Sequence, residues 1–193
     1  MSRVGFCMMD TDRFKGKIEN VALILMDVDG VLTDGGIILG TKNSEYKVFD
    51  VQDGMGVTLA RIAGLKVGLI TGRQSDIVAR RAEELHMDVC YQGVPDKLGP
   101  YLKILEKYGL SDEQVCYIGD DLLEMVILER AGFSVAVANA RPEVKDICDY
   151  VTENHGGHGA IRETIELILK GQGKWQNVLG QIKSHFQSRE GAA

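Results

Sequence analysis

The sequence predicts an α/β fold, a three-layer Rossmann-like sandwich with helices on both faces of a central parallel sheet and a projecting β-hairpin. Two observations lead to this prediction. Short apolar runs alternate with helical patterns along most of the chain, as expected for parallel strands joined by right-handed crossovers. Three of these runs, at 21–26, 66–70 and 115–118, end abruptly in polar residues. The 193 residues suit a single domain, 1–193, with a sizeable core.

The first third of the chain is interpreted from its apolar runs and its glycines. Residues 1–20 are polar and mixed and predict an N-terminal arm that leads into the strand 21–26. The stretch from Gly35 to Val51, with a polar turn between two apolar segments, predicts the hairpin. A turn is expected at 53–56, because it contains two glycines, and a helix is expected at 57–63.

The remainder of the chain alternates between strands and helices. Further strands are expected at 66–70, 89–91, 115–118, 134–137 and 150–151. The helices between and after them are expected at 75–85, 97–108, 121–131, 142–148 and 160–170. The polar residues at the end of the chain predict a flexible C-terminal tail, 176–193.

Composition limits the class of partner and the compartment. The net charge is -6 and there is no basic tract, which argues against nucleic acid as a partner. No apolar run is long enough to span a membrane, and the N-terminus has no signal-peptide pattern. The four cysteines are scattered without a Cys-x-x-Cys pair, which indicates reduced thiols. We therefore expect a cytoplasmic protein that binds neither nucleic acid nor a membrane.

Acidic side chains end two of the expected core strands. Asp27 and Asp29 follow the first strand and point the same way because strand side chains alternate, and Asp120 and Asp121 follow the strand 115–118. At ~4 Å and an effective dielectric of about 20, each pair of like charges costs roughly 4 kcal/mol. Hard carboxylate oxygens favour Mg²⁺ as the neutralising cation. An isolated Asp-x-Asp-Gly segment is more often a surface turn; the three polar strand ends together favour a magnesium site.

Groups that suit a phosphate follow along the chain. Thr71 ends the strand 66–70 and offers a hydroxyl, and Lys97 offers a compact positive charge. Each of these two residues alone would commonly be a surface residue. The segments DVDGVLT at 27–33, LITGR at 69–73, Lys97 and IGDD at 118–121 together resemble the four motifs of the haloacid dehalogenase superfamily of phosphohydrolases.

That resemblance implies a role for each motif. Asp27 is implied as the nucleophile that takes the phosphoryl group, and Asp29 as the acid that protonates the leaving alcohol and then activates water. Thr71 and Lys97 are implied to hold the phosphoryl oxygens. Mg²⁺ is implied to bind Asp120, Asp27 and the backbone carbonyl of Asp29.

Two more acids, Asp121 and Glu124, are implied to support the metal from close by. Members of the superfamily often carry aspartate where this chain has Glu124, and the substitution keeps the charge. The spacing between the motifs leaves no room for the cap domain that many members carry.

Beyond the motifs, the chain resembles the capless tetrameric phosphatases that act on 3-deoxy-D-manno-octulosonate 8-phosphate in lipopolysaccharide precursor synthesis. The shared segments include EYKVFDVQDGMGV at 45–57, YQGVPDK at 91–97 and GGHGAIRE at 156–163. The resemblance implies a homotetramer in which the hairpins form a central barrel and the C-terminal tail reaches toward a neighbour's site.

The same resemblance implies which residues contact a sugar acid phosphate. Gln52 and Thr58 stand where arginines are expected, which leaves the exact sugar open. The implied contacts are Asp29, Asp50, Val51, Gln52, Asp53, Gly54, Thr58, Gly72, Arg73, Arg81 and Lys97.

Three alternatives stay open from the sequence. A related capless enzyme would hydrolyse the 9-phosphate of a nine-carbon sugar acid. A phospho-receiver domain also surrounds one aspartate with acids, Thr and Lys, but the Asp27–Asp29 pair on one strand end and the hairpin argue against it. A non-catalytic tetramerising domain is disfavoured because Asp27, Asp29, Lys97 and Asp120 are all present.

Overall fold

Six parallel strands form the central sheet of the computed structural model, which describes residues 11–42 and 44–190. Their order across the sheet is β5-β4-β1-β6-β7-β8, and all of them are parallel, as predicted for the central sheet. The strands are β1 (Leu23–Met26), β4 (Lys66–Ile70), β5 (Val89–Tyr91), β6 (Val115–Gly119), β7 (Phe133–Ala136) and β8 (Tyr150–Val151).

Strand β1 lies at the centre because all four of its residues are apolar and all four are fully buried. It pairs in parallel with β4 on one side and β6 on the other, so that Met26 lies opposite Leu69 and Ile118. The residues that follow β1, β4 and β6 therefore emerge side by side at one edge of the sheet. This edge is where open α/β sheets bind their ligands.

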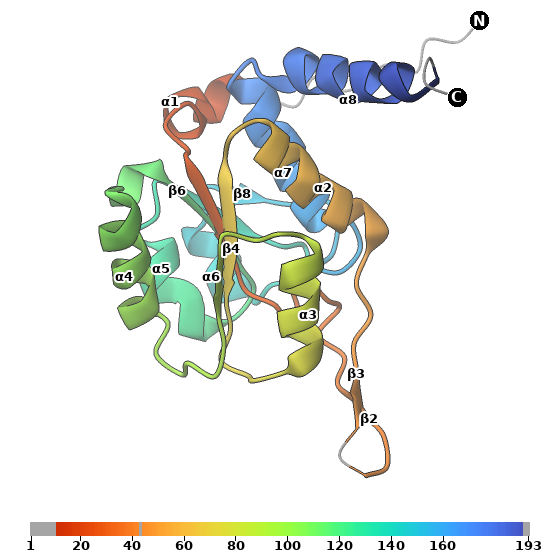
Figure 1. Cartoon of the computed structure of the whole chain (residues 1–193). Coiled ribbons are helices and arrows are strands. Elements are labelled where there is room, and N and C mark those ends of the chain that lie inside the picture. The colour runs from red at the N-terminus through yellow and green to blue at the C-terminus, as the bar shows by residue number, and fades with distance from the viewer. Residues whose placement is uncertain (1–10, 43, 191–193) are drawn as a thin grey trace, which may run out of the picture.

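Helices cover both faces of the sheet, as the sequence predicted (Figure 1). One face is covered by α2 (Val51–Ile62), α3 (Asp76–Glu84) and α7 (Ala160–Gly171), and α2 and α7 pack against each other. The other face is covered by α4 (Leu98–Tyr108), α5 (Met125–Leu128) and α6 (Pro142–Ile147). Short 3-10 turns complete the connections: η1 (Thr11–Phe14), η2 (Asp112–Gln114) and η3 (Leu122–Glu124).

Helix α2 begins earlier than the sequence predicted, since the expected turn at 53–56 is helical. The Asp50 side chain caps the helix by accepting from the backbone N–H groups of Gln52 and Asp53. The two glycines have a packing role instead: a β-carbon on Gly56 would lie 3.0 Å from the Cα of Arg162 in α7. The prediction of a turn was wrong because glycine also permits close contact between helices.

The predicted hairpin is present as the antiparallel strands β2 (Ile38–Leu39) and β3 (Glu45–Tyr46), in which Ile38 pairs with Tyr46. It extends beyond the carboxyl edge of the sheet (Figure 1). Its ladder is shorter than predicted, because the alternating segment 46–51 leaves the partner strand after Tyr46. Among the described residues, this ribbon is the insertion between β1 and α2, and no cap domain stands there.

Helical segments lie at both chain ends. Of the predicted N-terminal arm, residues 1–10 lie outside the described part, while η1 and α1 (Lys15–Ile18) pack against the sheet through Phe14, whose ring is 5.6 Å from that of Phe133. Residues 176–190, expected as part of a flexible tail, belong to helix α8 (Trp175–Glu190), at the opposite end from the hairpin (Figure 1). Within 11–42 and 44–190, no helix is long and apolar enough to cross a bilayer.

Candidate active site

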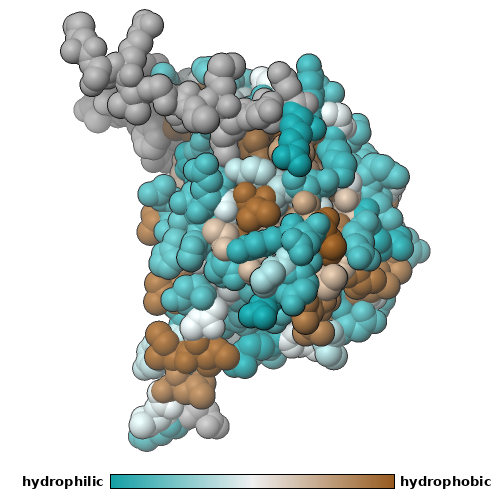
Figure 2. All heavy atoms as spheres, turned by 180° about the vertical axis from the view of Figure 1, so that it is seen from behind, coloured by the Kyte–Doolittle hydropathy of each residue, from teal (hydrophilic) through white to brown (hydrophobic). Residues whose placement is uncertain are grey.

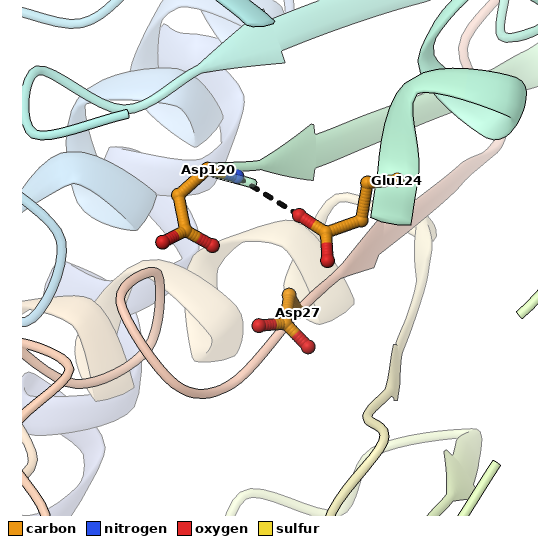
Figure 3. A group of neighbouring side chains, drawn as sticks. All are labelled: Asp27, Asp120 and Glu124. Carbon is orange, nitrogen blue, oxygen red and sulfur yellow. Dashed lines mark hydrogen bonds between the residues drawn. The ribbon is translucent and has the colours of Figure 1, made fainter. Parts of the chain in front are cut away.

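Three carboxylates from separate segments meet at the carboxyl edge of the sheet, and we call Asp27, Asp120 and Glu124 the acid group (Figure 3). Each offers an oxygen within 4.8 Å of the others. Asp27 follows β1, and its backbone N–H donates to the Ile118 carbonyl of β6 at 3.1 Å. Asp120 follows β6, and Glu124 ends η3. The central strands thus fix two of the three acids.

Glu124 connects the acid group to Lys97. One carboxylate oxygen of Glu124 accepts from the backbone N–H groups of Asp120 at 2.9 Å and Asp121 at 3.3 Å. The other accepts from the Lys97 ammonium at 2.6 Å, which also donates to Asp27 at 2.5 Å. The 3-10 turn η3 folds Glu124 back over the end of β6, so this residue lies inside the acid group rather than behind it.

Burial and mutual repulsion shift the proton affinities of the acid group. Burial raises the pKa of Asp27 to about 6, although Lys97 acts against this shift. Burial, with the negative charges of Glu124 and Asp27, raises the pKa of Asp120 to about 8. Burial alone would lower the pKa of Lys97, but the carboxylates of Asp27 and Glu124 outweigh it and raise that pKa. The site is therefore short of positive charge.

The residues of the acid group fit a divalent cation. Asp120 Oδ1 is buried and has no hydrogen-bond partner within the described residues, although buried polar atoms are normally paired. Lys97 provides one positive charge near three carboxylates. A β-carbon on Gly30, whose φ is +96°, would overlap the Asp120 carboxylate, so the chain is held close to this point. Oxygen ligands of this kind suit Mg²⁺.

Asp29 lies in a second group of charges, beside the acid group and made partly by the hairpin. We call Asp29, Glu45, Lys47 and Arg73 the Asp29 group. Lys47 donates to Asp29 Oδ1, and Arg73 Nε lies 3.7 Å from Asp29 Oδ2. Arg73 also donates to Glu45 at 3.2 Å. Lys47 was not predicted, because an alternating segment with apolar Tyr46 and Val48 predicts the lysine on the outward face, whereas Tyr46 and Val48 are exposed and Lys47 faces inward.

Thr71 and Gly72 follow β4 at the same edge of the sheet, next to the segment that contains Asp27. Thr71 is 2% exposed. Its backbone N–H donates to the Tyr91 carbonyl at 2.9 Å, and its carbonyl accepts from Val94 at 3.3 Å. These bonds tie the Thr71 segment to β5 and to the loop that leads to Lys97.

Comparison with known proteins gives the family. Residues 74–163 match the model of haloacid dehalogenase-like hydrolases. The 3-deoxy-D-manno-octulosonate 8-phosphate phosphatase KdsC of Escherichia coli K12 is 43% identical over 165 residues, which cover 86% of this chain and 88% of that protein. The chain is a haloacid dehalogenase-like hydrolase of the KdsC family.

Solved structures of KdsC-family proteins have the same fold. A 3-deoxy-D-manno-octulosonate 8-phosphate phosphatase from Yersinia pestis has a TM-score of 0.84 and 40% identity, covering 86% of this chain and 89% of that one. The phosphatase from Moraxella catarrhalis, in complex with magnesium, phosphate and a KDO molecule, has a TM-score of 0.86 and 38% identity, covering 89% and 98%. The α/β fold with its hairpin is therefore that of this family.

Several residues predicted to contact substrate in this KdsC-family chain have their side chains engaged elsewhere. Asp50 caps α2. Asp53 is fully buried and accepts from the backbone N–H groups of Gly159 and Arg162 at the start of α7, at 3.2 and 2.9 Å. The Thr58 hydroxyl donates to the Gly54 carbonyl within α2. The structure does not bring these three side chains to the acid group.

The remaining predicted residues lie around the start of α2 and after β6. Val51 is 83% exposed, and Gln52 lines a hollow of about 330 Å³ between α2 and α7. Arg81 packs over the Phe49 ring at 5.6 Å and beneath Gly54. Asp121 is exposed and caps η3 by accepting from Leu122, so it supports the loop and not the acid group itself.

Asn139 is a further residue near the acid group that was not predicted from the sequence. Its side-chain amide donates to the Gly30 carbonyl at 2.9 Å, and its carbonyl accepts from the Gly156 N–H at 2.6 Å. It therefore joins the Asp27–Asp29 loop to the glycine-rich loop before α7. No local pattern marks it, because both contacts are distant in sequence.

Proposed function

We propose that this KdsC-family chain is a Mg²⁺-dependent phosphatase that hydrolyses 3-deoxy-D-manno-octulosonate 8-phosphate to the free sugar acid and phosphate, in lipopolysaccharide precursor synthesis. The observation that carries the proposal is the acid group bridged by Lys97, set beside Thr71 at the carboxyl edge of the sheet. Family membership supports the choice of sugar acid, since the Escherichia coli relative has this activity in its name.

The chain's own residues divide the reaction between them. An Asp27 carboxylate oxygen attacks phosphorus, the bond from phosphorus to the sugar oxygen breaks, and an aspartyl-phosphate forms. Lys97 and Thr71 stabilise the phosphoryl oxygens. Asp29 gives its proton to the sugar oxygen and later takes one from the water that hydrolyses the aspartyl-phosphate.

The metal ligands in this proposal are Asp27, Asp120 and the backbone carbonyl of Asp29, with Glu124 holding the loop after β6. Mg²⁺, when bound there, supplies the positive charge that lets an anionic phosphoryl group approach the Asp27 carboxylate. The unpaired Asp120 Oδ1 supports this ligand set. Lys97 also stays paired with Glu124, which keeps its ammonium at the position of the phosphoryl group.

A phosphate-release assay with Mg²⁺ tests the function. The 8-phosphate of the octulosonate, the 9-phosphate of a nine-carbon sugar acid and p-nitrophenyl phosphate are compared for wild type and Asp27→Asn. We expect the highest kcat/KM for the 8-phosphate and a loss on the order of 10⁴-fold or more in the variant. A higher kcat/KM for the nine-carbon substrate would overturn the sugar assignment. Stable phosphorylation of Asp27 without turnover would indicate a receiver domain.

We also propose that the chain forms a homotetramer through its hairpin. The ribbon exposes Ile37, Ile38, Leu39 and Val48, each at least 49% exposed, and Figure 2 shows this apolar surface on the projecting ribbon. Exposed apolar clusters of this kind mark interaction surfaces. Light scattering of wild type is expected to give four chains, and Leu39→Lys is expected to give a smaller species. A monomeric wild type would contradict this.

The proposed compartment is the cytoplasm, which suits an enzyme of sugar-phosphate metabolism. Free thiols support it: Cys90, Cys116 and Cys148 form no disulfide with one another. Fractionation of cells that produce the protein tests this proposal, and recovery with periplasmic markers would contradict it.

A further inference from the structure

Lys47 is a buried cation of the hairpin that the proposed reaction leaves without a role. Its side chain is fully buried, whereas that of Asp29, to which it donates, is 20% exposed. Its second partner is Glu45, at 3.7 Å. Burying a lysine is unfavourable unless its charge is paired. The ion pairs with Asp29 and Glu45, and not packing alone, therefore explain why a lysine can be buried at this position.

The two oxygens of Asp29 are held by different residues. Lys47 contacts Oδ1, and Arg73 lies 3.7 Å from Oδ2. Arg73 is 47% exposed at its side chain and is shared with Glu45 at 3.2 Å. An exposed and shared contact constrains a carboxylate weakly. The buried Lys47 is therefore the contact that fixes the rotation of the Asp29 side chain.

The backbone of the hairpin explains why Lys47 can do this. Tyr46 and Val48 are 58% and 67% exposed, while Lys47 between them points inward, as alternation along an extended segment requires. The ribbon thus presents an apolar surface outward and one ammonium inward. Its inward side reaches the loop between Asp27 and Gly30.

We propose that Lys47 is a positioning residue: it holds the Asp29 carboxyl group in the orientation from which its proton reaches the leaving oxygen of the substrate. The proposal rests on the proposed phosphatase function. In the first step, the bond between Asp27 and phosphorus forms, and the bond from phosphorus to the substrate oxygen breaks. The electron pair goes to that oxygen, which takes the Asp29 proton. Lys47 itself touches neither the substrate nor phosphorus.

The nature of the leaving group separates this role from a general structural one. An alkoxide is a poor leaving group and needs the proton, whereas p-nitrophenolate leaves without one. A residue that only stabilises the fold affects both substrates equally. A residue that acts through Asp29 slows formation of the aspartyl-phosphate from the alkyl phosphate and spares its formation from the aryl phosphate, whereas the later hydrolysis of the aspartyl-phosphate is slowed for both.

The test uses Lys47→Met, which removes the charge and keeps roughly the length of the side chain. Lys47→Arg keeps the charge, and Lys42→Met, at the exposed tip of the same hairpin, is the control. For Lys47→Met we expect kcat on the octulosonate 8-phosphate to fall about 10- to 100-fold, as for other residues that orient catalytic groups. In single-turnover experiments with p-nitrophenyl phosphate, the rate of p-nitrophenolate release, which reports formation of the aspartyl-phosphate, should stay within about twofold. KM for both substrates should change little, Lys47→Arg should recover most of the loss, and Lys42→Met should match wild type.

A double-mutant cycle with Asp29→Asn provides the second measurement. If Lys47 acts through Asp29, Lys47→Met has no further effect on kcat in the Asp29→Asn background. Equal losses in the rate of aspartyl-phosphate formation from both substrates, no loss with either, or additive effects in the cycle would each overturn the proposal. Melting temperatures of all variants show whether each is folded.

Failure of the substrate assignment is distinguishable from failure of the Lys47 proposal. If wild type prefers another alkyl phosphate, the sugar assignment falls, and the same comparison is made with that alkyl phosphate. If wild type hydrolyses no alkyl phosphate, both proposals fall.

Discussion

The acid group and the Asp29 group are built from the same elements, carboxylates bridged by a lysine, but they differ in how they are supported. Asp27, Glu124 and Lys97 are all less than a tenth exposed and follow or flank the core strands. The Asp29 group instead depends on a two-stranded ribbon and on Arg73, whose side chain is 47% exposed. In the proposed reaction, Asp27, which attacks phosphorus, is therefore held by buried groups at the sheet edge, whereas Asp29, which transfers the proton, is held partly by the hairpin.

The strongest contrast between the two groups should be in stability. Lys97→Met leaves two buried carboxylates without their cation, and we expect a loss of about 3–5 kcal/mol in the free energy of unfolding at pH 8 without metal. Urea unfolding measures this value. Lys103→Met on the exposed face of α4, the helix that begins directly after Lys97, serves as the control and should change little. A loss below about 1 kcal/mol would show that Lys97 is not the main cation of the acid group.

Metal binding by the acid group should depend on pH, because the carboxylates with raised pKa values, Asp27 and Asp120, belong to this group. The pKa of Asp120 is about 8 in the folded protein, well above its value of about 4 in the unfolded chain. The folded protein therefore binds this proton more tightly, and the free energy of unfolding without metal falls as the pH rises from about 4 to 8. Mg²⁺ must displace that proton.

We therefore expect the apparent Mg²⁺ affinity to rise on the order of tenfold per pH unit between about pH 6 and 8. Titration calorimetry at pH 6, 7 and 8 measures it, and Asp120→Asn should abolish the dependence along with most of the binding. An affinity independent of pH would contradict the raised pKa of Asp120.

Asp53 is another buried carboxylate for comparison, and it is held by backbone N–H groups, whereas Asp27 and Asp29 are each held by a lysine. It accepts from the start of α7, where Gly159 has no capping side chain, and burial raises its pKa. We expect Asp53→Ala to lower the free energy of unfolding by about 1–2 kcal/mol, because two N–H groups lose their acceptor. Asp53→Asn keeps one acceptor and should fall between wild type and Asp53→Ala in urea unfolding. Equal stability of all three would rule out this capping contribution.

The smallest effect on stability is expected in the Asp29 group. Arg73→Met removes exposed ion pairs with Asp29 and Glu45, and the free energy of unfolding should change by less than about 1 kcal/mol. Urea unfolding beside Lys97→Met gives the direct comparison. If the two variants lose the same stability, the difference in burial between Lys97 and Arg73 has no energetic consequence.

The parallel sheet and the residues at its carboxyl edge could be predicted from the sequence alone. Buried apolar runs that end in Asp27, Thr71 and Asp120 indicated parallel strands, and parallel strands bring their ends together. The entry of Glu124 into the acid group was not predictable in that way, since it depends on the turn η3. The contacts of Lys47 and Asn139 with the Asp27–Asp29 loop depend on chain segments that are distant from it in sequence.

The loop that follows Asp27 is enclosed by glycines on one side. A β-carbon on Gly156 would overlap the Gly30 carbonyl, and one on Gly157 would lie 2.5 Å from the backbone of Asp34. Replacing either glycine would therefore force the backbone apart on that side of the loop, because even one added methyl group has no room there. On the ribbon side, the loop is held instead by side chains, since Lys47 and Arg73 contact Asp29. Substitutions on this side therefore change how the Asp29 carboxylate is held and leave the backbone around Asp27 in place.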